Sequence, residues 1–166
     1  PPTDASLKNP TRATGILESF YATNPGHPGV MHYLIHGYDY PPVAARGLEA
    51  AQAYAAVAPW VPHVLHMPSH IFTRLGMWKE SIDSNEASAQ AARRYASTFH
   101  PDAASFEELH ALDYQTYAAL QLADDGAAKV ARDRAASFEA GAVGGPYAFA
   151  LAAMLATAWP LLTGQR

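Results

Sequence analysis

The chain has 166 residues, 49% hydrophobic and 16% charged, so it is long enough for one domain with a sizeable core and too apolar to be disordered. Its formal net charge of −4 and its lack of a basic cluster argue against nucleic-acid binding, and no apolar run reaches the roughly 18 residues of a membrane span. The absence of cysteine excludes disulfides and thiolate metal sites and leaves the cellular compartment open.

Apolar periodicity and turn residues predict an all-α chain of eight helices with no strand. Residues 1–10 are expected to form an extended arm. Thr11 and Ser105 are expected to cap helices, with Glu108 at a capping-box position. The helices are expected at residues 11–21, 30–38, 43–58, 62–75, 78–97, 105–123, 127–140 and 146–162.

Two helices have predicted buried faces, read from the spacing of their apolar and small residues. The inward residues are expected to be Ile16, Leu17, Phe20 and Tyr21 in the first helix, and Ile82, Asn85, Ala89 and Ala92 in the fifth.

Histidines are concentrated in one part of the chain, with six of the eight between residues 27 and 70. His32 and His36 form an H-x-x-x-H pair, and His66 and His70 form a second pair 34 positions later, preceded by His63. Spacings of three and four place imidazoles on one face of a helix. An offset of 34 is the period of a tetratricopeptide (TPR) repeat, so we expect helical hairpins that bring the pairs side by side.

Three segments resemble parts of the TPR motif. Residues 74–82 (RLGMWKESI) are similar to its central turn, residues 121–128 (QLADDGAA) to the same junction in a later repeat, and residues 56–59 (AVAP) to its closing run. The histidine runs resemble a His-rich bacterial TPR-like variant. The resemblance covers about residues 28–140 and implies a TPR-like α-solenoid of about four helical hairpins, with residues 1–166 as one domain.

The resemblance also implies a register for the histidines, because residues 28–38, 62–75 and 105–122 become equivalent first helices that line one groove. His32 is then expected beside His66, and His36 beside His70. His110 is expected opposite His63 when the repeats are aligned on their loops, and opposite His66 when they are aligned on the histidines.

Imidazoles in this pattern favour a transition-metal site. The two pairs, His32 with His36 and His66 with His70, would hold one ion with four imidazoles. With His27 and His63 added, the set would instead hold two ions with three imidazoles each, similar in ligands to the coupled dicopper sites of tyrosinases and hemocyanins. His110 is a further candidate ligand.

The metal expected from the sequence is copper rather than zinc. Nitrogen ligands dominate, Met31 and Met67 adjoin the histidines as candidate soft ligands, and no H-E-x-x-H zinc motif is present. A copper-dependent oxidoreductase is therefore the enzyme class considered.

A second hypothesis is a non-enzymatic TPR scaffold that binds a peptide or protein partner, with the histidines as packing or pH-sensitive groups. Five aromatic residues are candidates for the wall of a groove that would suit a phenolic or peptide ligand: Tyr33, Tyr38, Tyr40, Trp60 and Phe72.

Two features leave structural alternatives open. Pro68 either interrupts a helix that runs through it or marks the true start of that helix. Residues 146–162 carry apolar side chains on more than one face, which predicts cover by a second copy of the chain or by flanking sequence of a longer protein.

Overall fold

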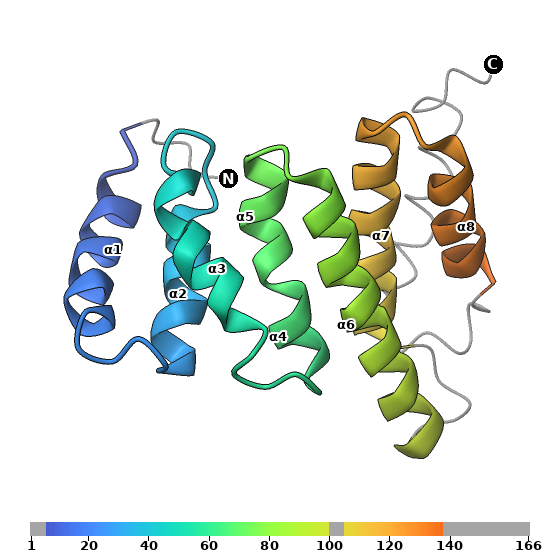
Figure 1. The fold of residues 1–166 in the computed structure, drawn as a ribbon, viewed down its shortest axis with the longest axis horizontal. Helices are drawn as coiled ribbons and strands as arrows, with labels where there is room; N and C mark the ends of the chain where they lie inside the picture. The colour runs from blue at the N-terminus through green and yellow to red at the C-terminus, as the bar shows by residue number, and fades with distance from the viewer. Residues whose placement is uncertain (1–5, 100–104, 138–166) are drawn as a thin grey trace.

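The computed structural model describes residues 6–99 and 105–137, and all regular structure in these ranges is helical. Figure 1 shows the helices arranged side by side, broadly in chain order from α1 to α8. The expected all-α fold is confirmed for these residues, whereas the helix predicted at 146–162 lies outside them. The elements are α1 Lys8–Tyr21, α2 Pro28–Tyr38, η1 Ala44–Gly47, α3 Leu48–Tyr54, α4 Pro62–His66, α5 Pro68–Arg74, α6 Trp78–Phe99, α7 Phe106–Gln121 and α8 Asp125–Ala136.

The first helix begins earlier than predicted. Lys8 is already helical, and the backbone N–H of Thr11 donates to the carbonyl of Leu7, so Thr11 lies inside α1 rather than at its N-cap. Pro10 does not prevent this, because an N–H in the first turn of a helix has no helical partner to lose.

The buried face of α1 differs in part from the prediction. Leu17 and Tyr21 are half-buried and pack against the core as expected, whereas Thr14 is the buried residue of the helix and Ile16 and Phe20 are 57% and 58% exposed. The reason lies on α2, where a Cβ added at Gly37 would come within 2.4 Å of Thr14 Cγ2. The two helices therefore approach each other closely where Thr14 faces the missing side chain of Gly37.

The helix predicted at 43–58 is shorter and divided into η1 and α3. A Cβ at Gly47 would lie 2.9 Å from Ile71 Cδ1 and 3.0 Å from Tyr38 Cβ, so this turn is packed closely against α2 and α5.

The helix predicted at 62–75 is interrupted at Met67, which separates α4 from α5. Met67 keeps helical dihedral angles (φ −51°, ψ −39°), and its N–H still donates to the carbonyl of His63. The chain thus follows a helical path through Met67. Pro68 interrupts this helix, the first of the two alternatives, because proline cannot supply the next backbone hydrogen bond.

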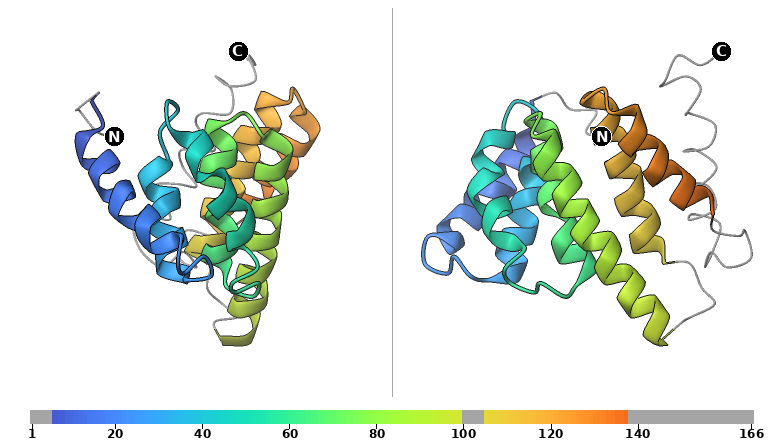
Figure 2. Two further views of the ribbon diagram at one scale, coloured as in Figure 1. Left: turned by 60° about the vertical axis from the view of Figure 1, so that its left-hand side comes forward. Right: turned by 45° about the vertical axis from the view of Figure 1, so that its right-hand side comes forward.

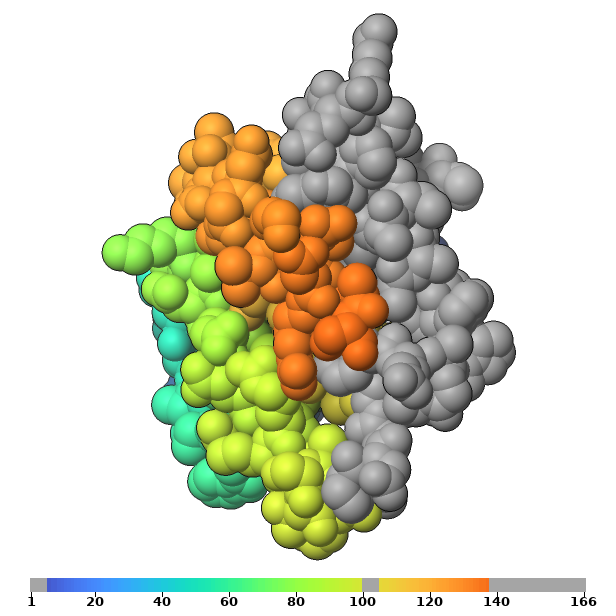
Figure 3. All heavy atoms as spheres, turned by 90° about the vertical axis from the view of Figure 1, so that its right-hand side faces the viewer, coloured from blue at the N-terminus to red at the C-terminus, as the bar shows by residue number. Residues whose placement is uncertain are grey.

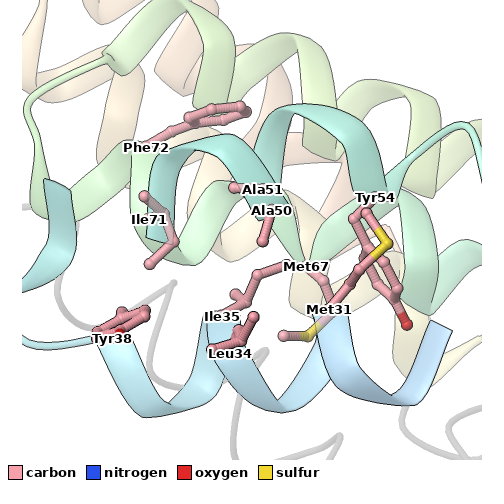
Figure 4. Packing of buried hydrophobic residues seen from close by; sticks show 10 residues of the cluster. All are labelled: Met31, Leu34, Ile35, Tyr38, Ala50, Ala51, Tyr54, Met67, Ile71 and Phe72. Atoms are coloured by element: carbon pink, nitrogen blue, oxygen red, sulfur yellow. The ribbon is translucent and has the colours of Figure 1, made fainter. Parts of the chain in front are cut away.

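A hydrophobic cluster fills the space between α2, α3 and α5 (Figure 4). Met31 and Met67 are 1% and 0% exposed within it, so both thioethers pack in the core. The copper-ligand role considered for them is therefore replaced by a packing role. The buried members are Met31, Leu34, Ile35, Tyr38, Ala50, Ala51, Tyr54, Met67, Ile71 and Phe72.

The second half of the described chain is built on α6, the longest helix, which packs against α4, α5 and α7 (Figure 2). Asn85, Ala89 and Ala92 are buried as predicted, and Ile82 is half-buried. Figure 3 shows α6 and α8 together on the face at this end of the molecule.

Capping at the start of α7 is not as predicted. Ser105 occupies the N-cap position but makes no side-chain cap bond. Glu108 is buried and its carboxylate accepts hydrogen bonds from Arg93 and Arg134, both at 3.0 Å. The glutamate therefore joins α6, α7 and α8, because a buried carboxylate requires charged partners.

Contacts between α2 and α5, and between α4 and α7, bring the histidine-bearing helices next to one another. None of the helices in the two described ranges is long and apolar enough to cross a lipid bilayer.

Candidate metal centre

Six of the seven candidate histidines lie in two groups of three. In each group, one ring nitrogen from each histidine lies within 4.8 Å of the other two. We call these groups the first triad (His32, His36 and His63) and the second triad (His66, His70 and His110).

The histidine rings within each triad are close together. In the first triad, the centroid of His32 lies 4.6 Å from that of His36 and 5.2 Å from that of His63. In the second triad, His66 lies 4.9 Å from His70 and 4.4 Å from His110.

The two triads adjoin, because ring centroids lie 5.5 Å apart for His36 and His70 and 6.4 Å apart for His63 and His66. His36 and His70 are therefore neighbours, as predicted from the offset of 34. His32 has His63 as a ring neighbour, where His66 was expected.

Each H-x-x-x-H pair stays within one triad and gains a third histidine from another helix, α4 for the first triad and α7 for the second. The arrangement has three imidazoles for each candidate ion, as in the second alternative, but His110 takes the place that this alternative gave to His27. His110 is the third member of the second triad, so aligning the repeats on the histidines gives its correct neighbour, His66.

His27 belongs to neither triad. It is the N-cap residue of α2, where its Nδ1 atom accepts a hydrogen bond of 3.3 Å from the backbone N–H of Val30. Its extended backbone (φ −76°, ψ 115°) lies outside the helix that presents His32 and His36. Capping therefore accounts for its position.

Side-chain oxygens orient two rings of the second triad. Nδ1 of His66 lies 2.6 Å from Oδ1 of Asn85, and Nδ1 of His70 lies 3.0 Å from Oδ2 of Asp39. The Asn85 amide is itself oriented, because its Nδ2 donates to the carbonyl of Ser81 at 2.8 Å. Both oxygens accept, so each Nδ1 carries a proton, and in the neutral ring each Nε2 then presents a lone pair.

The two Nε2 atoms of His66 and His70 lie 3.1 Å apart. Two lone pairs at this distance repel unless a cation lies between them. A proton could bridge these two nitrogens but would not bind the nearby nitrogen of His110. A metal ion can accept lone pairs from all three.

Burial disfavours a proton on two of these three rings, those of His66 and His110. Burial, with the charges of His70 and His110 as smaller causes, lowers the pKa of His66 to about 2. Burial also lowers the pKa of His110 to about 4. Neutral imidazole is the form that binds metal.

Asp39 is held as an anion. Burial raises the pKa of this carboxyl, but hydrogen bonds from His70 and Arg74 outweigh burial and leave the pKa below its usual value. Arg74 Nε donates to Oδ1 of Asp39 at 2.7 Å. The result is a carboxylate–histidine pair of the kind that fixes ring orientation and raises basicity at metal sites.

The first triad is more open, because His36 and His63 are exposed, the side chain of His63 at 46%, while His32 is half-buried. Nδ1 of His32 lies 3.4 Å from the hydroxyl of Tyr54, and Nδ1 of His63 lies 3.9 Å from a carboxylate oxygen of Glu107. Burial and the neighbouring His36 lower the pKa of His32 to about 4.

Tyr114 is part of the second triad's surroundings. Its ring centroid lies 4.8 Å from that of His66, 5.4 Å from His70 and 5.2 Å from His110. Its hydroxyl lies 3.4 Å from Nδ1 of His70, and burial raises its pKa to about 12, so the ring is a neutral phenol.

Sequence reasoning missed Tyr114 and did not assign Asn85 or Asp39 as partners of the histidines. In the sequence, Asp39 is the only acidic residue in the segments 28–40 and 62–75 that carry the paired histidines, and Asn85 was expected on the buried face of α6. Those two signals pointed to the correct residues without indicating their contacts.

The aromatic residues proposed for a groove wall have different environments. Tyr38 and Phe72 are core residues and Trp60 is 71% exposed. Tyr33 and Tyr40 line a cleft beside His36.

Comparison with known proteins gives no match: no family model, curated protein or solved structure is significantly similar to this chain.

Proposed function

We propose that the protein binds two transition-metal ions, one at each histidine triad. The observation that carries this proposal is the 3.1 Å separation of the Nε2 atoms of His66 and His70, whose opposite ring nitrogens both face oxygen acceptors. A third nitrogen, from His110, lies close enough to complete a three-imidazole ligand set.

Copper is the metal we favour. All six triad ligands are imidazoles, and a set of nitrogen ligands without an oxygen or sulfur donor suits copper well. Three protein ligands also leave a coordination position open on each ion, as catalytic metal sites do. We therefore propose a copper-dependent oxidoreductase as the enzyme class.

The TPR-like α-solenoid remains our proposal for the architecture, with α2, α4 together with α5, and α7 as equivalent first helices. It is supported by the contacts of α2 with α5 and of α4 with α7, since equivalent helices of successive repeats lie side by side.

Metal stoichiometry tests the proposed sites. The purified protein is dialysed separately against Cu²⁺ and Zn²⁺, and bound metal is measured by elemental mass spectrometry. We expect about two equivalents of copper in the wild type and about one in His32→Ala and in His70→Ala, because each variant loses one ligand of a different triad.

His27→Asn is the matched control, because asparagine retains the helix cap and His27 belongs to neither triad. It should retain both equivalents, and circular dichroism should give the same helical content for all variants. A wild type that retains no metal, or equal metal loss in all three variants, would replace this proposal with the peptide- or protein-binding scaffold. Higher retention of zinc than of copper would overturn the choice of metal.

A further inference from the structure

An apolar cleft of about 480 Å³ lies between α1 and α2 and reaches His36 of the first triad. It has the volume of a small-molecule site, which is typically about 300–1,000 Å³. The residues that matter for its chemistry are Ala13, Ile16 and Leu17 on one side and Tyr33, His36 and Tyr40 on the other.

No Asp, Glu, Lys or Arg is among the described residues that line the cleft, and its polar side chains are those of His36, Tyr33 and Tyr40. Ile16 and Tyr33 are 57% and 61% exposed, so two large apolar side chains remain uncovered beside a candidate metal ligand. Exposed apolar surface that converges on a polar group is typical of a binding site for an apolar molecule with one polar atom.

We infer that this cleft binds an uncharged phenol with a single ring, and that the hydroxyl of this ligand is directed toward the first triad. The ring would contact Leu17 and Ile16 on one side and the ring of Tyr33 on the other. This inference rests on the proposed function in one respect: an ion at the first triad would receive the hydroxyl oxygen.

The open character of the first triad supports this assignment. His36 is exposed, and three imidazoles leave a coordination position free for an oxygen from the ligand. An extended peptide fits less well, because the cleft walls are mainly helices whose backbone groups already bond within the helix and are not free to bind a second backbone.

The test measures 4-methylphenol binding by ligand-observed NMR, using the zinc-loaded and the metal-free protein. Toluene is the comparison ligand, because it keeps the ring and methyl group but lacks the hydroxyl. We expect 4-methylphenol to bind the zinc-loaded protein about tenfold more tightly than the metal-free protein, and toluene to bind both forms equally, since only the hydroxyl meets the ion.

Ala13→Trp should weaken 4-methylphenol binding at least about tenfold, because an indole would occupy the cleft. Ser19→Trp is the matched control: it places the same ring at another exposed position of α1, outside the cleft. Both variants should retain the wild-type zinc stoichiometry, which is measured on the same samples.

Equal effects of Ala13→Trp and Ser19→Trp, or no 4-methylphenol binding to either form, would overturn the cleft assignment even if two zinc ions are bound. Absence of bound zinc would instead overturn the metal proposal. In that case, weakening by Ala13→Trp alone would still locate the ring in the cleft.

Discussion

His36 and His70 lie 34 positions apart in the sequence, and their ring centroids are 5.5 Å apart in the structure. One belongs to the first triad and the other to the second. This contact makes the two triads parts of one continuous centre, so ions bound at both would influence each other.

Electron paramagnetic resonance of the copper-loaded protein tests this relationship. We expect the wild-type Cu²⁺ signal to be broadened by interaction between two neighbouring ions. His70→Ala should give a sharper signal typical of one isolated ion, because its second triad is incomplete. A sharp wild-type signal that accounts for two full equivalents of copper would mean that the ions do not interact.

Asp39→Asn should weaken metal binding at the second triad about 10- to 100-fold, because the partner that orients His70 loses its negative charge. Titration calorimetry with Zn²⁺ should register this change in one of the two binding events. Asp113→Asn is the matched control, since Asp113 is half-buried nearby and belongs to neither triad. Equal losses of zinc affinity in both variants would mean that the effect comes from removing a negative charge near the site and not from the contact between Asp39 and His70.

Acid should destabilise the metal-free protein. The pKa of His66 is lowered from 6.5 to about 2, and those of His32 and His110 to about 4. Below pH 6.5 the unfolded chain takes up protons at these residues while the folded protein does not, so stability falls as pH falls. Between pH 7 and 5 the loss from His66 alone is on the order of 2 kcal/mol.

Thermal unfolding followed by circular dichroism should therefore give a Tm several degrees lower at pH 5 than at pH 7. His110→Phe keeps a ring against Phe106 but cannot take up a proton, so it should lose part of this pH dependence. A Tm that is constant across this range would show that the histidines are not held neutral by burial.

Apolar periodicity and turn residues were sufficient to predict the helices, and the repeat register predicted the contact between His36 and His70. Helical periodicity, however, fixes the alignment of two neighbouring helices only to within about one turn. It therefore could not choose between His63 and His66, one turn apart, as the neighbour of His32, or fix the position of His110.

Residue spacing in the sequence could not predict which side chains from other parts of the chain would contact the histidines. Asn85 and Asp39 lie 19 and 31 positions from the histidines they contact, and no periodic rule links those separations. The division between α4 and α5 could be predicted, because a proline such as Pro68 cannot supply a backbone hydrogen bond to the helix. The burial of Thr14 in place of Ile16 and Phe20 could not be predicted, because it depends on the missing side chain of Gly37 on another helix.

Gly37→Ala should destabilise the protein by about 1–3 kcal/mol, because the new Cβ would lie 2.4 Å from Thr14 Cγ2. Thr14 cannot move away easily, since its hydroxyl donates to the carbonyls of Pro10 and Thr11 and its branched side chain has few rotamers. Denaturant unfolding of the metal-free protein measures the loss.

Thr14→Ser removes the clashing methyl group and keeps the hydroxyl, so it should recover most of the stability lost in Gly37→Ala when the two changes are combined. Gly15→Ala is the matched control, because nothing lies within 4 Å of its added Cβ and alanine favours the helix, which predicts a gain of about 0.5–1 kcal/mol. If the Gly37→Ala loss persisted in the double variant, the close approach of α1 to α2 at Thr14 would not be its cause.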